Sequence, residues 1–506
     1  MRKGNSILTR VLLALPLLGL PLSAALGQDS ANPPAESGAA QDNSQQSGTT
    51  PAPAFGVDTQ APEVIVNPPI SGIDQPGLEP HAAPLSYLQP SLHVSEAADS
   101  NISNTLGNSD FHSDTFALGS LELQRLWSHY DLALDYVGGL GYYSAGGIGF
   151  QNLEQFDVNQ KITWKRGELG IRDSFSYMPD GSFAGSYGST NGFGESLGGG
   201  VPGSFWGNTA FGSLGQIPRI MNLTLADVTE YLTPKSSVTG AVGYGFVHYT
   251  GNTQVQGVNF LGSSQLSAQG GYNRVLGPHD QAAIVYGYQQ FDFSTAGLAF
   301  HSSIVQLLWG HRISGRMDFL VGAGPQFTSF SEGGSSNSQI SVAGKAMLRY
   351  KFPKTVLSLS YQRYNTNGSG FFAGAETDYA ELSASRPISR VWSMTADLGY
   401  AHNKREAPLT LQQQITCEFS GAAPASECAG VPSNTFDYGF VGVAIHRMLG
   451  RNFHVFASYQ FNDLSFDKSF CGVSATGASL APCDRMSQRQ LGTIGLDWRP
   501  RPIRLD

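Results

Sequence analysis

The sequence predicts an all-β chain: a single transmembrane antiparallel β-barrel of about 18 strands, after a signal peptide and a disordered N-terminal segment. Three observations predict it: the composition, long segments in which polar and apolar residues alternate, and connections that alternate between short and long. Of 506 residues, 61 are Gly, 11% are aromatic and only 14% are charged. Such a composition favours strands and turns over helices. The formal charge of -9 provides no basic surface for a nucleic acid, so no nucleic-acid partner is expected.

Two segments of the chain, residues 1–27 and 28–84, precede the expected barrel. Residues 1–27 read as a secretory signal peptide, because Arg2, Lys3 and Arg10 precede a short apolar stretch that ends in small residues. Residues 28–84 are rich in Pro, Ser and Gln and are expected to form a flexible periplasmic segment. After residue 27 no apolar run reaches 18 residues, so no membrane-spanning helix is expected. The mature chain is then a soluble exported protein or an outer-membrane barrel.

The barrel is expected over residues 85–506, where short turns rich in Pro, Gly and basic residues alternate with longer polar loops. Seventeen connections join eighteen strands, and sixteen strands is the alternative if the two weakest segments, 87–98 and 220–233, are not strands. The predicted turns are 128–129, 165–167, 234–236, 277–280, 314–315, 352–354, 387–389 and 449–450, and the predicted loops are 99–114, 144–155, 179–219, 250–262, 293–297, 330–337, 365–374, 403–433 and 463–485.

The strand segments alternate as a lipid-facing wall requires. In residues 392–400, for example, Trp392, Met394, Ala396 and Leu398 alternate with more polar positions. Soluble strands average about 5–6 residues, whereas tilted strands that cross a bilayer need about 9–11, and these segments have the greater length. Short and long connections also alternate along the chain, which places the short turns at one end of the strands and the long loops at the other. This arrangement favours a membrane barrel over a soluble sandwich. Aromatic residues near strand ends are expected at the membrane interfaces, among them Tyr143, Phe156, Trp164, Tyr177, Tyr249, Trp309, Tyr350, Tyr400 and Trp498.

Both ends of the expected barrel resemble known sequences. The segment Pro90–Ile102 resembles the first strand of the second-type β-barrel porins, which ends in an aromatic-Asp-x-Asn turn. In this chain Asp99 and Asn101 match the Asp and Asn of that turn, but Ala98 stands where the aromatic residue is usual. The last strand, Gly492–Trp498, resembles the assembly signal of outer-membrane proteins, although eight residues follow it. The resemblance implies an outer-membrane channel that the barrel-assembly machinery inserts.

The four cysteines fall in two pairs, each within one expected outer loop. Cys417 and Cys428 form one pair, and Cys471 and Cys483 form the other. Because an exported chain passes through an oxidising compartment, each pair is expected to form a disulfide, with cross-loop pairing as the alternative. No CxxC spacing occurs and neither loop contains His, so no metal site and no cofactor are expected.

No catalytic constellation stands out. The single GxSxG match, Gly194–Gly198, lies in a loop rich in Gly and Ser and lacks the strand-to-helix turn that such a nucleophile needs. The eleven His residues are scattered along the chain. The protein is therefore not expected to be an enzyme.

Because successive residues of a strand face opposite sides, this alternation, called parity below, assigns each polar residue to the inner or the outer face. The polar residues assigned to the inner face are the best indication of function in the sequence. Their mixed signs favour passage of polar, hydrated solutes, while the alternative is that they pair with one another and stiffen the wall. The main lumen-lining candidates are Asp157, Lys161, Arg172, Lys345, Arg349, Glu381 and Asp397, and the same alternation adds Glu122, Asp135, Arg312 and Asp497.

These observations predict a porin-like channel of the bacterial outer membrane, through which small hydrophilic solutes diffuse passively or with weak selectivity. A non-conducting surface anchor or adhesion barrel, and an exit duct for an exported polysaccharide, are the alternatives. The expected partners are outer-membrane lipid, further copies of the chain, and a periplasmic partner for the N-terminal segment. The aromatic-rich loop 179–219 is expected to fold into the lumen or over its mouth, with packing on the loop 403–433 as the alternative.

Overall fold

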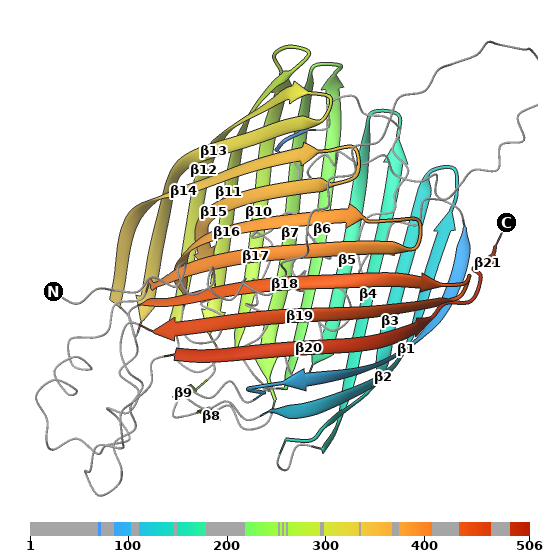
Figure 1. Cartoon of the computed structure of the whole chain (residues 1–506). Coiled ribbons are helices and arrows are strands. Elements are labelled where there is room, and N and C mark those ends of the chain that lie inside the picture. The colour runs from blue at the N-terminus through green and yellow to red at the C-terminus, as the bar shows by residue number, and fades with distance from the viewer. Residues whose placement is uncertain are drawn as a thin grey trace, which may run out of the picture.

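Eighteen long strands join edge to edge in one antiparallel sheet, and the computed structural model describes them together with a few short connecting segments (Figure 1). The described residues are 69–71, 86–102, 111–145, 149–178, 218–250, 254–255, 258–259, 262–293, 298–332, 335–366, 374–406, 435–466 and 486–505. The barrel strands are β1 (Tyr87–Asp99), β2 (His112–Leu126), β3 (Tyr130–Tyr143), β4 (Gly149–Trp164), β5 (Gly167–Met178), β6 (Arg219–Thr233), β7 (Ser236–Tyr249), β10 (Ser263–Val275), β11 (Asp280–Phe293), β12 (Leu298–Ser314), β13 (Met317–Glu332), β14 (Ser335–Lys351), β15 (Val356–Thr366), β16 (Ala375–Pro387), β17 (Trp392–Arg405), β18 (Thr435–Leu449), β19 (Phe453–Phe466) and β20 (Met486–Trp498).

The sheet closes on itself. Each strand pairs with its neighbours in the chain, and β1 also pairs with β20 from Leu92 opposite Trp498 to Asp99 opposite Leu491. Closure satisfies the backbone hydrogen bonds that an edge strand would expose to lipid. The predicted all-β barrel of about 18 strands is confirmed, including the two weakest segments, which form β1 and β6.

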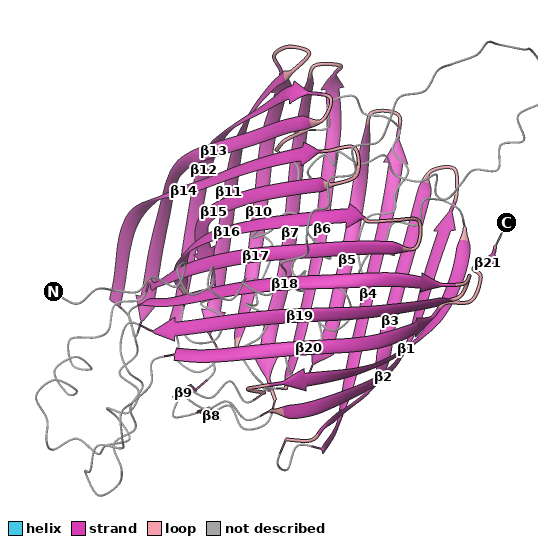
Figure 2. Cartoon of the chain, in the orientation of Figure 1, coloured by secondary structure: helices cyan, strands magenta, loops and turns pink. Residues whose placement is uncertain are grey.

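Three short strands lie outside the barrel ladder of eighteen. β8 (Gln254–Val255) and β9 (Val258–Asn259) pair only with each other, and β21 (Ile503–Arg504) pairs with the start of β1. Figure 2 shows that strands account for almost all of the described chain. Among the described residues, no helix has the length and apolar character needed to cross a membrane.

All eight predicted short turns lie at the same end of the barrel, called the short-turn end below, and their positions are confirmed. Several of the predicted long loops are wrong in extent, by three or four residues at 112–114, 403–405 and 463–466 and by more at two places. β4 already begins at Gly149, within the predicted loop 144–155, and β13 and β14 leave only residues 333–334 between them, where a loop over 330–337 was predicted. These strand ends are polar because they lie beyond the apolar part of the outer face, so their composition resembles that of a loop.

Several expectations concern residues outside the described ranges. The signal peptide 1–27, most of the segment 28–84, the four cysteines and nearly all of the loop 179–219 are among them. For these the sequence-based predictions stand as predictions.

A closed barrel without a free edge should resist detergent until it is boiled. We expect unboiled protein to run on a denaturing gel at a different position from boiled protein, and its circular dichroism to show mostly β structure. A substantially helical spectrum, or a gel position that boiling does not change, would contradict the closed barrel.

Candidate functional site: the inner wall of the barrel

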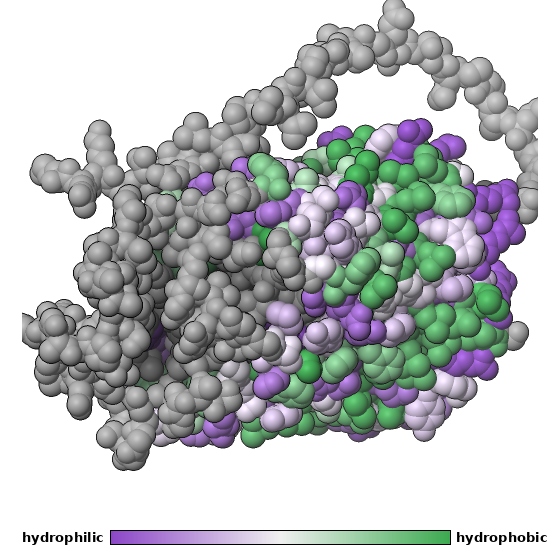
Figure 3. All heavy atoms as spheres, turned by 90° about the horizontal axis from the view of Figure 1, so that it is seen from below, coloured by the Kyte–Doolittle hydropathy of each residue, from purple (hydrophilic) through white to green (hydrophobic). Residues whose placement is uncertain are grey.

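The register of the sheet gives the barrel an apolar outer face and a polar inner face. On β1, Leu92 and Val94 are 54% and 55% exposed, whereas His93 and Ser95 between them are 2% and 3% exposed. Directly paired residues share a face, so the same division continues around the closed sheet. Figure 3 shows hydrophobic side chains spread over the part of the wall that it displays, with hydrophilic ones at the right-hand edge. A sheet with this pattern suits a membrane on one side and water on the other.

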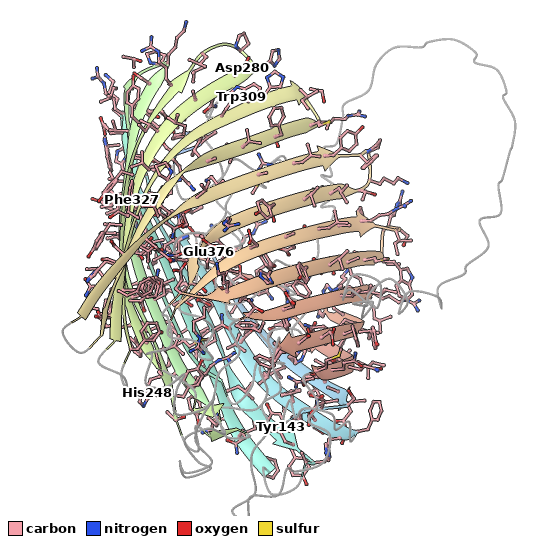
Figure 4. The ribbon with its side chains drawn as sticks, turned by 90° about the vertical axis from the view of Figure 1, so that its left-hand side faces the viewer. Tyr143, His248, Asp280, Trp309, Phe327 and Glu376 are labelled. Atoms are coloured by element: carbon pink, nitrogen blue, oxygen red, sulfur yellow. The ribbon has the colours of Figure 1, made fainter. Side chains whose placement is uncertain are left out.

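Tryptophans mark the membrane boundary at the short-turn end. Trp127, Trp164, Trp309, Trp392 and Trp498 all lie in this part of the barrel, and each is at least 37% exposed. Their ring edges meet charged groups: the Trp164 Nε1 donates to Glu230 at 2.7 Å, and the Trp309 Nε1 donates to Asp280 at 3.2 Å. Figure 4 places Asp280 and Trp309 together at this end, far from His248 and Tyr143. Indole rings with one apolar body and one polar edge are typical of a membrane interface.

Tyrosines mark the opposite boundary on β15–β18. The Tyr361 hydroxyl donates to Asp378 at 2.6 Å, and the Tyr400 hydroxyl donates to Asp437 at 2.8 Å. The residues that follow on this outer face are charged, since His402 Nδ1 lies 2.6 Å from the same Asp437 carboxylate. The outer face therefore changes from apolar to charged at these tyrosines, which is the pattern of a second interfacial girdle.

The predicted girdle is confirmed for Trp164, Trp309, Tyr400 and Trp498, but the predictions for Tyr143 and Tyr249 are wrong. Tyr249 lies opposite Arg219 on the inner face and packs against a buried inner cluster. Tyr143 is 1% exposed and packs edge-on against Phe116, with the ring centroids 5.7 Å apart. Both residues lie on the inner face near the ends of their strands. Parity, rather than closeness to a strand end, decides which aromatics meet lipid.

Three carboxyl groups form a row on the inner face of β2, β3 and β4. Glu122 pairs directly with Asp135, and Asp135 pairs directly with Asp157. The Tyr87 hydroxyl donates to Glu122, and Gln155 Nε2 donates to Asp157 at 2.7 Å. Neighbouring strands lie about 4.8 Å apart, so these acidic groups are adjacent on one part of the wall.

Basic side chains lie on the opposite wall. Among the eighteen strands in ring order β3 is third and β14 is twelfth, so β14 lies across the barrel from the carboxyl row. Lys345 and Arg349 are on the inner face of β14. Arg349 holds Asp318 of β13 in a two-point contact, Nε to Oδ1 at 2.9 Å and Nη2 to Oδ2 at 2.6 Å.

The two groups also lie at similar depth. Asp135 is the sixth residue of β3 and Lys345 the seventh of β14 when each strand is counted from the short-turn end. At about 3.3 Å per residue, both therefore lie well inside the barrel and not at its rim. The inner wall therefore has a charged ring at this level, in which the carboxyl row on β2–β4 lies across the barrel from Lys345 and Arg349 on β14.

The other predicted inner residues join this ring in pairs. Lys161 Nζ lies 2.8 Å from Glu168, and Arg172 Nη2 lies 3.4 Å from Asp227. The predictions did not include Glu168, Asp227 or Asp318 as partners. Strand parity applied to every charged residue would have found all three, because each lies on the inner face of its strand.

Glu381 and Asp397 face inward on the neighbouring strands β16 and β17, where the Tyr379 hydroxyl donates to Glu381 at 3.0 Å. The structure thus places all seven predicted residues on the inner face, some in ion pairs and some in a row of like charge. That they line a conducting lumen stays a prediction. Within the described ranges no cluster of three or more His, Cys, Asp or Glu side chains could hold a metal ion.

No protein-family model and no curated protein matches the sequence. Solved structures of similar shape include the outer-membrane protein OpdK of Pseudomonas aeruginosa, at 10% identity over 82% of this chain and 98% of that chain, with a TM-score of 0.38. OpdO of the same organism gives 11% identity over 82% and 97%, with a TM-score of 0.39. OccK2 (OpdF) of that organism in complex with glucuronate gives 10% identity over 83% and 98%, with a TM-score of 0.38. Similarity this distant carries no argument about the function of this chain.

Proposed function

We propose that the protein is a channel of the bacterial outer membrane through which small hydrophilic solutes diffuse. The observation that carries the proposal is the closed 18-strand wall, which is apolar outside between two aromatic girdles and charged inside. Barrels with 16–18 strands are wide enough to leave an aqueous lumen, whereas barrels of about 8 strands are filled by their own side chains. The inner ring would be superfluous in a barrel that served only as an anchor.

The charged ring supports weak selectivity in place of a specific binding site. Opposite charges across a water-filled passage orient dipolar solutes, while ion pairs such as Arg172 with Asp227 cancel part of the net charge. The uncancelled carboxyl row on β2–β4 favours cations over anions. Lys161, Lys345, Arg349, Glu381 and Asp397 are the further residues proposed to contact the passing solute. The proposal also includes three partners. The barrel-assembly machinery inserts the chain, further copies of the chain associate with it, and a periplasmic partner binds the N-terminal segment.

Removing the carboxyl row should weaken the preference for cations. We expect the triple variant Glu122→Gln, Asp135→Asn, Asp157→Asn to keep its conductance and to shift the reversal potential of a planar bilayer in a KCl gradient toward zero. The matched control is Glu154→Gln, which removes one carboxylate from the outer face of β4, where the Tyr136 hydroxyl contacts it at 2.6 Å. That variant should keep the reversal potential of the unmodified protein.

The same recordings test the channel itself. An unchanged reversal potential in the triple variant would rule out the carboxyl row as a selectivity element. Absence of conductance from correctly folded, heat-modifiable protein would overturn the channel and favour the surface anchor.

A further inference from the structure

Three residues that precede the barrel in the sequence lie inside it. Pro69–Ser71 contact the inner wall although β1 begins only at Tyr87. The Ile70 N–H donates to Asn273 Oδ1 at 3.1 Å. The Ser71 carbonyl accepts from Gln269 Nε2 at 2.9 Å and from Thr239 Oγ1 at 3.1 Å. These contacts join the segment to β7 and β10 through both its backbone and its side chains.

The Ile70 side chain covers an apolar patch on the inner wall. Ile70 is 6% exposed and packs with Ala283, Val285, Leu308, Leu320 and Met347 in one buried cluster. Register places all five wall residues on the inner face of β11–β14, where a water-filled lumen would otherwise wet them. Burial of an aliphatic side chain against such a patch is favourable because it removes apolar surface from water.

Two glycines of the wall leave room for the segment. A Cβ atom at Gly271 would lie 2.7 Å from the Ser71 Cβ, and a Cβ atom at Gly310 would lie 3.3 Å from the Ile70 Cγ2. Larger residues at these positions would crowd the segment, since real Cβ atoms do not approach within 3.0 Å of another atom. The wall is therefore shaped to receive these residues closely.

The segment lies at the depth of the charged ring. Met347 is the fifth residue of β14 from the short-turn end and Leu320 the fourth of β13, while Lys345 of the ring is only two residues beyond Met347. The part of the wall that holds Ser71, on β7 and β10, contributes no charged side chain to the inner face. Ser71 thus lies on an uncharged sector of the inner wall, while Ile70 packs next to β14, where the inward Lys345 and Arg349 flank Met347.

We propose that Pro69–Ser71 is a built-in constriction element, which stays docked on the inner wall of β7 and β10–β14 and narrows the passage at the level of the charged ring. This proposal rests on the proposed channel function. It assigns Ile70 and Ser71 to the lining of the narrow region, so that solutes pass between these two residues and the acidic row on β2–β4.

Docking can be tested without any measurement of transport. The double variant Ser71→Cys, Gly271→Cys should form a disulfide, because the two Cβ positions lie within the reach of the usual Cβ–Cβ separation of about 3.8 Å after a small shift. Mass spectrometry of a non-reduced digest should recover the linked peptides. The matched control is Ser71→Cys, Gly270→Cys, since Gly270 faces outward and a Cβ there meets nothing within 4 Å.

Constriction is tested by single-channel recording of the full-length protein and of two variants. We expect deletion of residues 69–71, and Ile70→Asp, to raise the unit conductance, and Ile70→Val to leave it unchanged because the apolar contact remains. A disulfide with position 271 but not 270, together with a higher conductance after deletion, would support the proposal.

The remaining outcomes overturn it at distinct points. If no link to position 271 forms, the docked position is wrong. If the link forms and deletion leaves the conductance unchanged, the docked segment is no constriction. If no form conducts, the channel function fails and the constriction fails with it, while the disulfide result still reports whether the segment is docked.

Discussion

Arginine in place of Ala396 should prevent a large part of the protein from folding stably into a bilayer. Ala396 faces outward on β17, midway between Trp392 at the short-turn girdle and Tyr400 at the opposite girdle. Arginine on the lipid face of a barrel costs about 2–4 kcal/mol at the midplane of the bilayer. We expect the urea midpoint for unfolding from lipid vesicles to fall by the corresponding amount, with the heat-modifiable band as the measure of folded protein.

The adjacent residue provides a matched control. Thr395 lies at nearly the same depth but faces inward, opposite Ser385 and Ala444 and two residues from the inward Asp397. Thr395→Arg adds the same side chain to the same strand, beside a carboxylate in place of lipid. It should lower the urea midpoint much less than Ala396→Arg. Equal losses in the two variants would show that the assignment of inner and outer faces on β17 is wrong.

Most of the barrel could be predicted from the sequence because lipid constrains it directly. A strand that crosses a bilayer must place apolar residues on every second position, and the turns at one end must be short. Those two constraints located all eighteen strands and all eight short turns. The prediction failed at strand ends that extend beyond the lipid-facing part of the barrel. Residues 335–337, for example, belong to β14, but they were predicted as a loop because their Ser and Asn composition resembles one.

Parity alone also placed the candidate residues, but it could not provide their partners. Which inner residue lies beside which depends on the register between strands, and register is a property of the folded sheet. The Arg172–Asp227 pair, for example, joins β5 to β6 across the connection over 179–218. Charge type and alternation together indicate an ion pair. Only the register shows that Asp227 lies opposite Gly170, which is two residues before Arg172 on the same face of β5.

The docked segment left no periodic signal in the sequence. Three residues are too few to show alternation, and the sequence around Ile70 is dominated by Pro, Ser and Gly. The site that receives it is assembled from strands more than 160 residues away, with Thr239 and Asn273 on β7 and β10 and the apolar patch on β11–β14. Contacts of this kind become visible only after the whole sheet has been closed.

A buried ion pair crosses the closing seam of the barrel, and breaking it should destabilise the barrel more than loss of any exposed charge could. Asp99 on β1 and Arg489 on β20 lie on the inner face of the seam between the first and last strands, 0% and 1% exposed. Arg489 Nε donates to Oδ1 and Oδ2 of Asp99 at 3.0 and 2.8 Å.

The turn after β1 adds further bonds across the same seam. The Asn101 N–H donates to Asp99 Oδ1 at 2.9 Å, and Asn101 Nδ2 donates to the Ser487 hydroxyl at 3.1 Å. The Ser100 N–H donates to the Gln490 carbonyl at 3.0 Å. The Asp-x-Asn pattern that the sequence shares with the second-type porins therefore has a physical role here, since it fastens the first strand to the last.

Replacing Asp99 by Asn should lower the stability of the barrel by about 3–5 kcal/mol, because Arg489 would remain buried without its counter-charge. The control is Asp280→Asn, which removes one partner of an exposed pair, His311 Nδ1 with Asp280 at 2.8 Å, with exposures of 32% and 37%. Pairs as exposed as this contribute about 0–1 kcal/mol. The double variant Asp99→Leu, Arg489→Met removes both charges and should recover most of the loss, as apolar replacements of buried pairs do. The urea midpoint for unfolding from lipid vesicles measures the stability of all three variants. If Asp99→Asn and Asp280→Asn have equal midpoints, the seam is held by its backbone hydrogen bonds alone.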